Sequence, residues 1–194
     1  MKFRGGEKMS ETMKLYHAGF EVIQKPDVHF GRKNADFGQG FYMSAQEEFA
    51  RRWARIRKGQ DTVLNSYELD LSGLRVHTFK RNEKWFEYIY ANRNHLPDTL
   101  QSADVIIGPI ANDTIYDTFG IITSGFLTHH QAMRLLMIGP AYEQIVLKTE
   151  KAASQLHFIA SEILDPSEVE QYRRTVAEEE AAYQKALAEM LDRI

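Results

Sequence analysis

Strand-length and helix-length apolar segments alternate irregularly along this chain, and their order is the feature that most restricts its fold. A regular alternation of strand and helix would favour a doubly wound parallel sheet, because each parallel pair of strands needs a crossover connection that is usually helical. Here strand segments follow one another in some regions, and helical segments do so in others. The order therefore predicts an α+β domain.

Composition narrows the class of protein further. The chain has 194 residues, 43% of them apolar, which suffices for a single domain with one sizeable core. The formal net charge of -3 gives no electrostatic basis for binding the backbone of duplex nucleic acid. The chain has no cysteine, so disulfides, thiolate nucleophiles and cysteine metal sites are excluded and a cytoplasmic location is expected. Since no apolar run approaches the length of a membrane span, we expect no membrane association.

Three regions are predicted along the chain. Residues 1–13 carry two glycines and mixed charges, so they are expected to be a flexible leader to a domain at 14–164. Residues 165–194 are expected to form a helix packed on that domain or on a partner, with Asp165 as its N-cap and Pro166 in its first turn. Apolar residues recur every seven positions in this helix. They are Val169, Val176, Tyr183 and Met190, with Tyr172 and Leu187 beside them.

The other elements are assigned from periodicity and turn residues. Strands are predicted over residues 14–19, 40–44, 102–110, 145–148 and 156–160, with one or two more within 61–79. Helices are predicted over residues 82–95 and 112–124, from Thr128 with Gln131 in the capping position, and as a short turn before residue 156. A further helix is predicted to begin at Ser44, where Glu47 completes a capping box. Its core-facing side is expected to carry Phe49, Trp53 and Ile56.

Four segments together resemble successive motifs of one protein family. They are "LYHAG", "DFGQGFYMS", "DVIIGPIANDTIYDT" and "EQIVLKTEKAASQLHF", and they extend from residue 14 to about residue 160. The family is an uncharacterised bacterial one, built around the pattern DFGxGFY and assigned to the ADP-ribosyltransferase superfamily. The segment "GQGFYMS" is also similar to the Gly-x-Gly-x-Tyr segment of poly(ADP-ribose) polymerases. The resemblance implies an ADP-ribosyltransferase-like core of two small, split β-sheets with flanking helices, and NAD bound as a substrate in the cleft between them.

The chemistry of such a family determines which residue types its site needs. Loss of nicotinamide from the ribose builds positive charge at the anomeric carbon, as glycoside hydrolysis does. A carboxylate or amide near the ribose hydroxyls, an aromatic face against the leaving ring and a group that orients the ribose would favour that change. The resemblance implies that His17 binds the ribose and that Tyr42 stacks on nicotinamide. Gly38 and Gly40 would let the backbone approach the ligand closely.

Glu143 and Gln144 are alternatives for the residue that acts on the ribose. Laid on the polymerase pattern, Glu143 is the acid, whereas relatives with the DFGxGFY pattern carry glutamine at the position of Gln144. Neighbours in a strand point to opposite faces, so at most one of the two faces the sugar. A carboxylate would stabilise the cation more than an amide would, because the amide carries no full charge. We take Gln144 as the family residue and keep Glu143 open; together with Tyr42 they form the predicted catalytic set.

Other residues are predicted to contact the dinucleotide. Arg32 is expected either to pair with the pyrophosphate or to be a solvated loop arginine. Asp36 is expected to brace the turn, and Ser44 to cap a helix whose N-terminus favours anions. The full predicted binding set is His17, Ala18, Gly19, Arg32, Phe37, Gly38, Gly40, Tyr42 and Ser44. No metal site is expected, because His129 and His130 are adjacent and would point about 100° apart on a helix.

Two functions remain open from the sequence. The favoured one is an NAD-dependent ADP-ribosyltransferase that transfers ADP-ribose to a protein or nucleic-acid acceptor, or to water; the resemblance implies the toxin half of a bacterial toxin–antitoxin pair, with an antitoxin as partner. The alternative is a catalytically weak or inactive module that binds NAD or a protein through its terminal helix. The arginines at positions 51, 52, 55 and 57 are interpreted as a solvated face that could receive a nucleic-acid acceptor. Chemistry on an RNA 2′-phosphate would need several basic residues in the cleft, which the sequence does not place.

Overall fold

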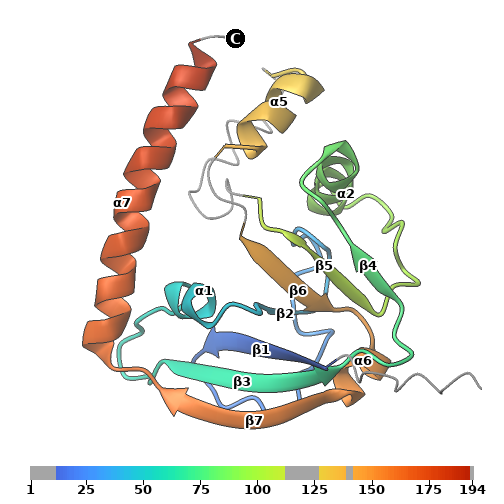
Figure 1. The fold of residues 1–194 in the computed structure, drawn as a ribbon, viewed down its shortest axis with the longest axis vertical. Helices are drawn as coiled ribbons and strands as arrows, with labels where there is room; N and C mark the ends of the chain where they lie inside the picture. Colours follow the sequence, from blue (N-terminus) through green and yellow to red (C-terminus); the bar gives the residue numbers. More distant parts are fainter. Residues whose placement is uncertain (1–11, 112–126, 139–141, 193–194) are drawn as a thin grey trace, which may run out of the picture.

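A computed structural model describes residues 12–111, 127–138 and 142–192 of the protein. It has a mixed α+β fold with two sheets and a long C-terminal helix, which confirms the predicted class (Figure 1). The first sheet is antiparallel, in the order β1 (Thr12–Gly19), β3 (Val63–Asp70) and β7 (Leu156–Ile163). The second has the order β2 (Phe41–Met43), β6 (Glu143–Leu147), β5 (Val105–Pro109) and β4 (Val76–Thr78). In the second sheet β4 and β5 run parallel, and the other pairs are antiparallel.

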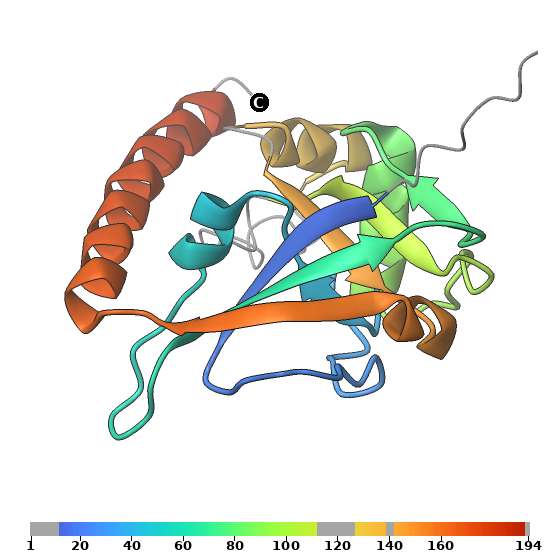
Figure 2. The same ribbon diagram turned by 60° about the horizontal axis from the view of Figure 1, so that its bottom comes forward.

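The two sheets are joined at one point by the backbone. Tyr16 of β1 and Ser44, just after β2, form an antiparallel bridge in which Tyr16 N donates to Ser44 O at 2.8 Å and Ser44 N donates to Tyr16 O at 3.0 Å. This bridge brings the second half of β1 alongside β2 (Figure 2). Residues that are 25 positions apart in the sequence therefore become neighbours at the junction of the sheets.

Apolar side chains fill both faces of the second sheet. One cluster contains buried residues of both sheets, among them Leu15, Tyr67, Val105 and Ile145, and so forms the core between them. A second cluster lies on the other face, where Val146 and Ile106 pack with Trp85, Phe86 and Ile89 of α2 (Glu83–Arg93). Burial on both faces explains why β5 and β6 read as continuous apolar runs in the sequence.

In the described part of the chain, the remaining helices are α1 (Glu47–Arg52), α5 (His129–Leu136), α6 (Glu150–Ser154) and α7 (Pro166–Leu191). Capping residues set several of their starts. Asn82 accepts a hydrogen bond from Trp85 N at the start of α2, and Thr149 accepts one from Ala152 N at the start of α6. Asp165 accepts from Ser167 N at 2.7 Å, as predicted for the start of α7.

The helix predicted to begin at Ser44 is shorter than expected. It begins after an N-cap at Gln46, and the Ser44 hydroxyl accepts from Gln46 N at 3.0 Å, so Ser44 makes a local turn rather than a capping box. It ends at Arg52, with Trp53 as its C-cap, and the chain then makes a hairpin closed by the Arg57–Gln60 bridge. The prediction of a core-facing side was right for Phe49, which is buried, and wrong for Trp53 and Ile56, which are 40% and 55% exposed. These two residues lie beyond the helix, so its periodicity does not govern them.

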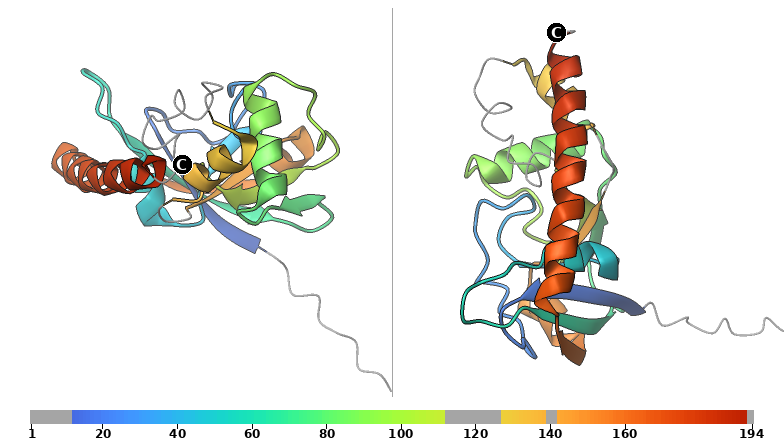
Figure 3. Two further views of the ribbon diagram at one scale, coloured as in Figure 1. Left: turned by 90° about the horizontal axis from the view of Figure 1, so that it is seen from above. Right: turned by 90° about the vertical axis from the view of Figure 1, so that its left-hand side faces the viewer.

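Helix α7 lies along the side of its own domain (Figure 3). Its buried residues are Val169 and Tyr183, which belong to the predicted seven-residue pattern, and Leu187, which was predicted to flank it. Tyr183 and Leu187 pack in the cluster around α2. Arg51 pairs with Glu168 at 2.8 Å, and Arg52 pairs with Glu179 at 2.6 Å. These two arginines are therefore not the solvated face that the sequence suggested, because they connect α1 to α7.

Some sequence predictions fall outside the described residues. The helix predicted over 112–124 lies there, and so does the leader apart from Thr12 and Met13, which already belong to β1. Among the described residues, no helix combines the length and the apolar character that crossing a membrane requires.

Candidate functional site

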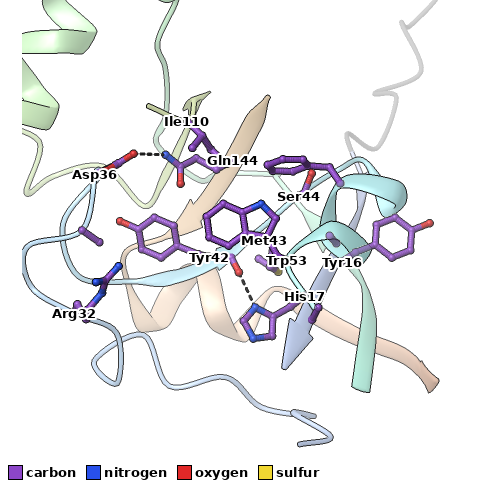
Figure 4. Close-up of a pocket in the computed structure, with 14 residues that line it drawn as sticks. Tyr16, His17, Arg32, Asp36, Tyr42, Met43, Ser44, Trp53, Ile110 and Gln144 are labelled. Carbon is purple, nitrogen blue, oxygen red and sulfur yellow. Dashed lines mark hydrogen bonds between the residues drawn. The ribbon is translucent and has the colours of Figure 1, made fainter. Parts of the chain in front are cut away.

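A pocket of about 310 Å³ lies at the junction of the two sheets (Figure 4). Its walls come from β1, β2, β6, α1 and the connection that precedes β2. The predicted site residues that line it are His17, Ala18, Arg32, Tyr42, Ser44 and Gln144. The predicted residues that do not line it are Gly19, Phe37, Gly38, Gly40 and Glu143.

The backbone of β2 determines the chemical state of His17. The Nδ1 atom lies 2.8 Å from the Tyr42 carbonyl oxygen and donates its hydrogen to it, so Nε2 is left as an acceptor in the neutral ring. Burial lowers the pKa of His17, and the hydrogen bond to Tyr42 offsets this only in part. Gly19 leaves Nε2 uncovered, since a Cβ at that position would lie 3.4 Å from it. His17, which lines the pocket, therefore has a neutral ring whose Nε2 can accept a hydrogen bond.

This pKa shift predicts that stability depends on pH. The lowered pKa keeps His17 neutral in the folded protein while the unfolded chain takes up a proton, so the unfolded state binds more protons and acid favours it. The stabilisation is complete above about pH 6.5, the ordinary histidine pKa, and is lost as the pH falls toward the lower folded-state value. Between about pH 7.5 and about pH 5.5, the melting temperature of the wild type should fall further than that of His17→Gln. His157→Gln, at an exposed position on β7, is the control that should keep the wild-type dependence; an equal fall in His17→Gln would contradict the assignment.

The hydroxyl of Tyr42 is bound within its own motif. It donates to the Gly38 carbonyl oxygen at 2.6 Å and accepts from Phe37 N at 3.0 Å. Burial, with the nearby charge of Asp36, raises the pKa of Tyr42, so the phenol keeps its proton. Because the hydroxyl is occupied, Tyr42 presents the apolar surface of its ring to the pocket.

The motif glycines pack against protein rather than against the pocket. A Cβ on Gly40 would lie 2.5 Å from the Leu147 carbonyl oxygen, and one on Gly38 would lie 2.8 Å from Lys148 Nζ. Gly38 also has a φ of +73°, a backbone conformation that other residues rarely adopt. The prediction that these glycines leave backbone bare for a ligand is not supported, because their open faces are turned toward β6 and the residue after it.

The alternation of β6 separates Gln144 from Glu143. Gln144 is buried and lines the pocket, whereas Glu143 is exposed and does not. The Gln144 amide nitrogen lies 3.5 Å from Asp36 Oδ2 (Figure 4). Asp36 in turn forms an ion pair of 2.7 Å with Arg93, and both side chains are buried. Of the two alternatives, the structure thus places the amide in the pocket, held by a carboxylate.

The other predicted residues differ in what they can do. Arg32 is exposed and lines the pocket, so it supplies a cation at its edge. The Ser44 hydroxyl is 3.4 Å from the Glu143 carbonyl oxygen and accepts from Gln46 N, so it mainly ties backbone segments together. Phe37 is fully buried in the core cluster around α2 and has no surface toward the pocket.

Some lining residues were missed in the sequence. Trp53 and Phe49 of the α1 region line the pocket, and so do Asp36 and Ile110. The ring of Trp53 stands edge-on to Phe49, with centroids 5.9 Å apart. Periodicity assigned Trp53 to the core, although the charged residues and Gly59 that follow it already indicate the end of the helix.

The pocket combines few polar groups with apolar walls, as small-molecule sites do. Its polar groups include two acceptors, His17 Nε2 and the Gln144 amide oxygen, and a cation at the edge, Arg32. The rings of Tyr42 and Trp53 line it as apolar surfaces. Such a set suits a ligand with a flat ring, hydroxyl donors and a negative charge at its outer end.

Comparison with known proteins identifies the family. Residues 13–158 match the model of a family described as a protein of unknown function (DUF3990), and the chain belongs to this family. No curated protein shows significant similarity to the chain, and no solved structure does.

Proposed function

We propose that this protein is an NAD-dependent ADP-ribosyltransferase whose fold has an ADP-ribosyltransferase-like core. The observation that carries the proposal is the meeting of His17, Tyr42 and Gln144 in one pocket at the junction of two small sheets. The motifs around these three residues resemble those of the ADP-ribosyltransferase superfamily, which supports the transfer of ADP-ribose from NAD. The acceptor of ADP-ribose is then a protein or nucleic acid, or water, and the resemblance suggests the toxin half of a toxin–antitoxin pair.

The residues of the pocket fit the nicotinamide and its ribose. The ring of Tyr42 offers a face for the flat pyridinium. His17 Nε2 accepts from one ribose hydroxyl, and the Gln144 amide oxygen accepts from a second. A volume of about 310 Å³ lies at the lower end of the range of roughly 300–1,000 Å³ for ligand pockets, which suits one ring and one sugar better than a whole dinucleotide. The pyrophosphate would then lie toward the exposed guanidinium of Arg32.

The reaction itself breaks the bond between the anomeric carbon and the pyridinium nitrogen. The bonding electron pair leaves with nicotinamide, which becomes neutral, and the positive charge moves to the ribose. The oxygen of Gln144 carries a partial negative charge that favours the cation over the neutral ground state. An acceptor oxygen or nitrogen then bonds to the anomeric carbon and loses its proton.

The test is release of nicotinamide from NAD by the purified protein. Gln144→Ala should lower kcat/KM by roughly 5- to 150-fold, because a buried ribose hydroxyl loses its acceptor. Glu143→Ala, which changes the neighbouring exposed residue on β6, is the matched control and should stay within about threefold of the wild type. Equal losses in both variants would contradict the assignment of Gln144. If no nicotinamide is released with any acceptor, the alternative is favoured, in which the protein binds NAD or another protein without turnover. Calorimetry with NAD would then show whether the protein binds the dinucleotide.

A second arm of this test probes His17 without removing it. In Gly19→Ala the added methyl group would lie 3.4 Å from His17 Nε2, an ordinary contact that the fold can accept. The methyl would nonetheless hinder a ligand hydroxyl from reaching that nitrogen. We expect an unchanged melting temperature together with a raised KM for NAD, and an unchanged KM would argue against a role for Nε2.

A further inference from the structure

The carboxylate of Asp36 is held from several directions at the edge of the pocket. Its Oδ1 accepts from Arg93 Nε at 2.9 Å and from Arg93 Nη2 at 2.7 Å. Its Oδ2 accepts from Ala111 N at 3.3 Å and from Gln144 Nε2 at 3.5 Å. Asp36 is only 6% exposed. These partners come from α2, β6 and the residue after Ile110, so the carboxylate has little freedom to turn.

A fixed carboxylate determines which way the amide of Gln144 faces. An ionised carboxylate only accepts hydrogen bonds, whereas an amide has a donor end and an acceptor end. Only the NH₂ end of Gln144 can face Asp36 favourably, since the other orientation would place two oxygens next to each other. The amide oxygen is therefore turned away from Asp36 and toward the pocket (Figure 4). Asp36 thus determines whether Gln144 presents an acceptor or a donor to a ligand.

We propose that Asp36, fixed by Arg93, is a positioning residue that makes Gln144 an obligatory hydrogen-bond acceptor. Together with the acceptor at His17 Nε2, Gln144 then selects a ligand with a pair of hydroxyl donors. The charge of Asp36 also polarises the amide, because an amide that donates to an anion carries more negative charge on its oxygen. Although residue 144 is not a carboxylate, its amide oxygen thereby carries additional negative charge, because Asp36 accepts from its nitrogen. This inference rests on the proposed function, in which the hydroxyl pair belongs to the ribose of NAD.

Exchanging the acid and the amide between positions 36 and 144 gives a test that distinguishes positioning from a purely structural role. In Asp36→Asn, the new amide keeps an oxygen for Arg93 and turns its NH₂ toward Gln144, which must then flip and present a donor to the pocket. Ala111 N loses its acceptor in this variant and in the double variant alike, so that loss lowers the stability of both equally. We expect kcat/KM for nicotinamide release to fall roughly 10- to 100-fold. In Asp36→Asn combined with Gln144→Glu, the asparagine NH₂ donates to the new carboxylate, whose second oxygen faces the pocket as an acceptor. The double variant should recover to within about threefold of the wild type.

Asp104→Asn is the control for losing a buried aspartate outside the pocket. Asp104 is 1% exposed and pairs with Arg75 at 3.1 Å, so its loss should lower stability while leaving kcat/KM nearly unchanged. All assays are run below the lowest melting temperature in the set. A double variant that is as weak as the product of the two single effects would overturn the proposal.

A stability measurement separates failure of this inference from failure of the proposed function. In Gln144→Glu alone, two carboxylates face each other, which raises the pKa of Glu at position 144, so the folded state binds an extra proton. Stability of this variant, relative to the wild type, should therefore fall as the pH rises from about 5 to about 8, and Asp36→Asn should remove the dependence. If the wild type releases no nicotinamide, the proposed function fails while this pattern still supports the positioning. If the pattern is absent, the positioning fails whatever the activity.

Discussion

Replacing Arg93 with alanine is expected to lower the free energy of unfolding by about 3–5 kcal/mol. The side chains of Arg93 and Asp36 are 8% and 7% exposed, and their closest atoms are 2.7 Å apart. Removing the guanidinium would take this ion pair from a carboxylate in a site that water reaches poorly. In a protein of this size, where 1 kcal/mol corresponds to roughly 2–4 °C, the melting temperature should fall by roughly 6–20 °C.

Arg173→Ala supplies the matched control for this prediction. Arg173 pairs with Glu170 on the surface of α7 at 3.3 Å, and its side chain is 78% exposed. Exposed pairs of this kind contribute little, so the control should differ from the wild type by at most about 0.5 kcal/mol. Thermal and urea denaturation of both variants would give the comparison. Similar values for the two variants would show that other groups compensate Asp36. The fixed position of its carboxylate, and with it the orientation assigned to the Gln144 amide, would then lose its basis.

Local patterns of the sequence predicted much of the secondary structure. The capping pair at Thr128 and Gln131 is observed, since Thr128 N donates to the Gln131 side-chain oxygen at 2.8 Å and Gln131 N donates to the Thr128 hydroxyl. Two residues of the seven-residue pattern of the terminal helix, Val169 and Tyr183, are buried, and so is Leu187, which was predicted beside it. Such features depend on residues a few positions apart, which is why the sequence alone reveals them.

Contacts between distant segments could not be predicted in this way. Asp36 and Arg93 are 57 positions apart, and Arg52 and Glu179 are 127 apart. Nothing in either local pattern indicates the partner, so Asp36 was interpreted as a turn residue and Arg52 as solvated. Trp53 shows the converse error, because a helical period was extended past the residue where the helix ends. In the candidate site, some of the motif residues line the pocket, such as His17, Tyr42 and Gln144, whereas the motif glycines and Phe37 do not. The residues that hold and cover the lining residues were not predicted.

The sequence and the structure give different reasons for the glycine at position 40. If Gly40 served ligand approach, Gly40→Ala would fold normally and bind its ligand poorly. The structure instead puts the new methyl group 2.5 Å from the Leu147 carbonyl oxygen and 2.6 Å from Val146 Cγ1. Both are part of β6, which lies between β2 and β5 in the second sheet, and both residues are fully buried. A central, buried strand has little room to move, so the contact should be costly.

Gly40→Ala is therefore expected to lower the free energy of unfolding by about 3 kcal/mol or more, with a fall of roughly 6–12 °C in the melting temperature. Gly19→Ala is the comparison, because its methyl group meets no atom closer than 3.4 Å and should cost less than about 1 kcal/mol. The two variants should differ in which property they lose. Gly40→Ala should lose stability, whereas Gly19→Ala should keep its stability and lose affinity for NAD. If Gly40→Ala instead kept its stability and lost affinity for NAD, Gly40 would face the ligand and β6 would have moved to accommodate the methyl group. Comparing the two variants in stability and in affinity for NAD thus distinguishes a motif whose glycine is needed for packing of the sheet from one whose glycine contacts the substrate.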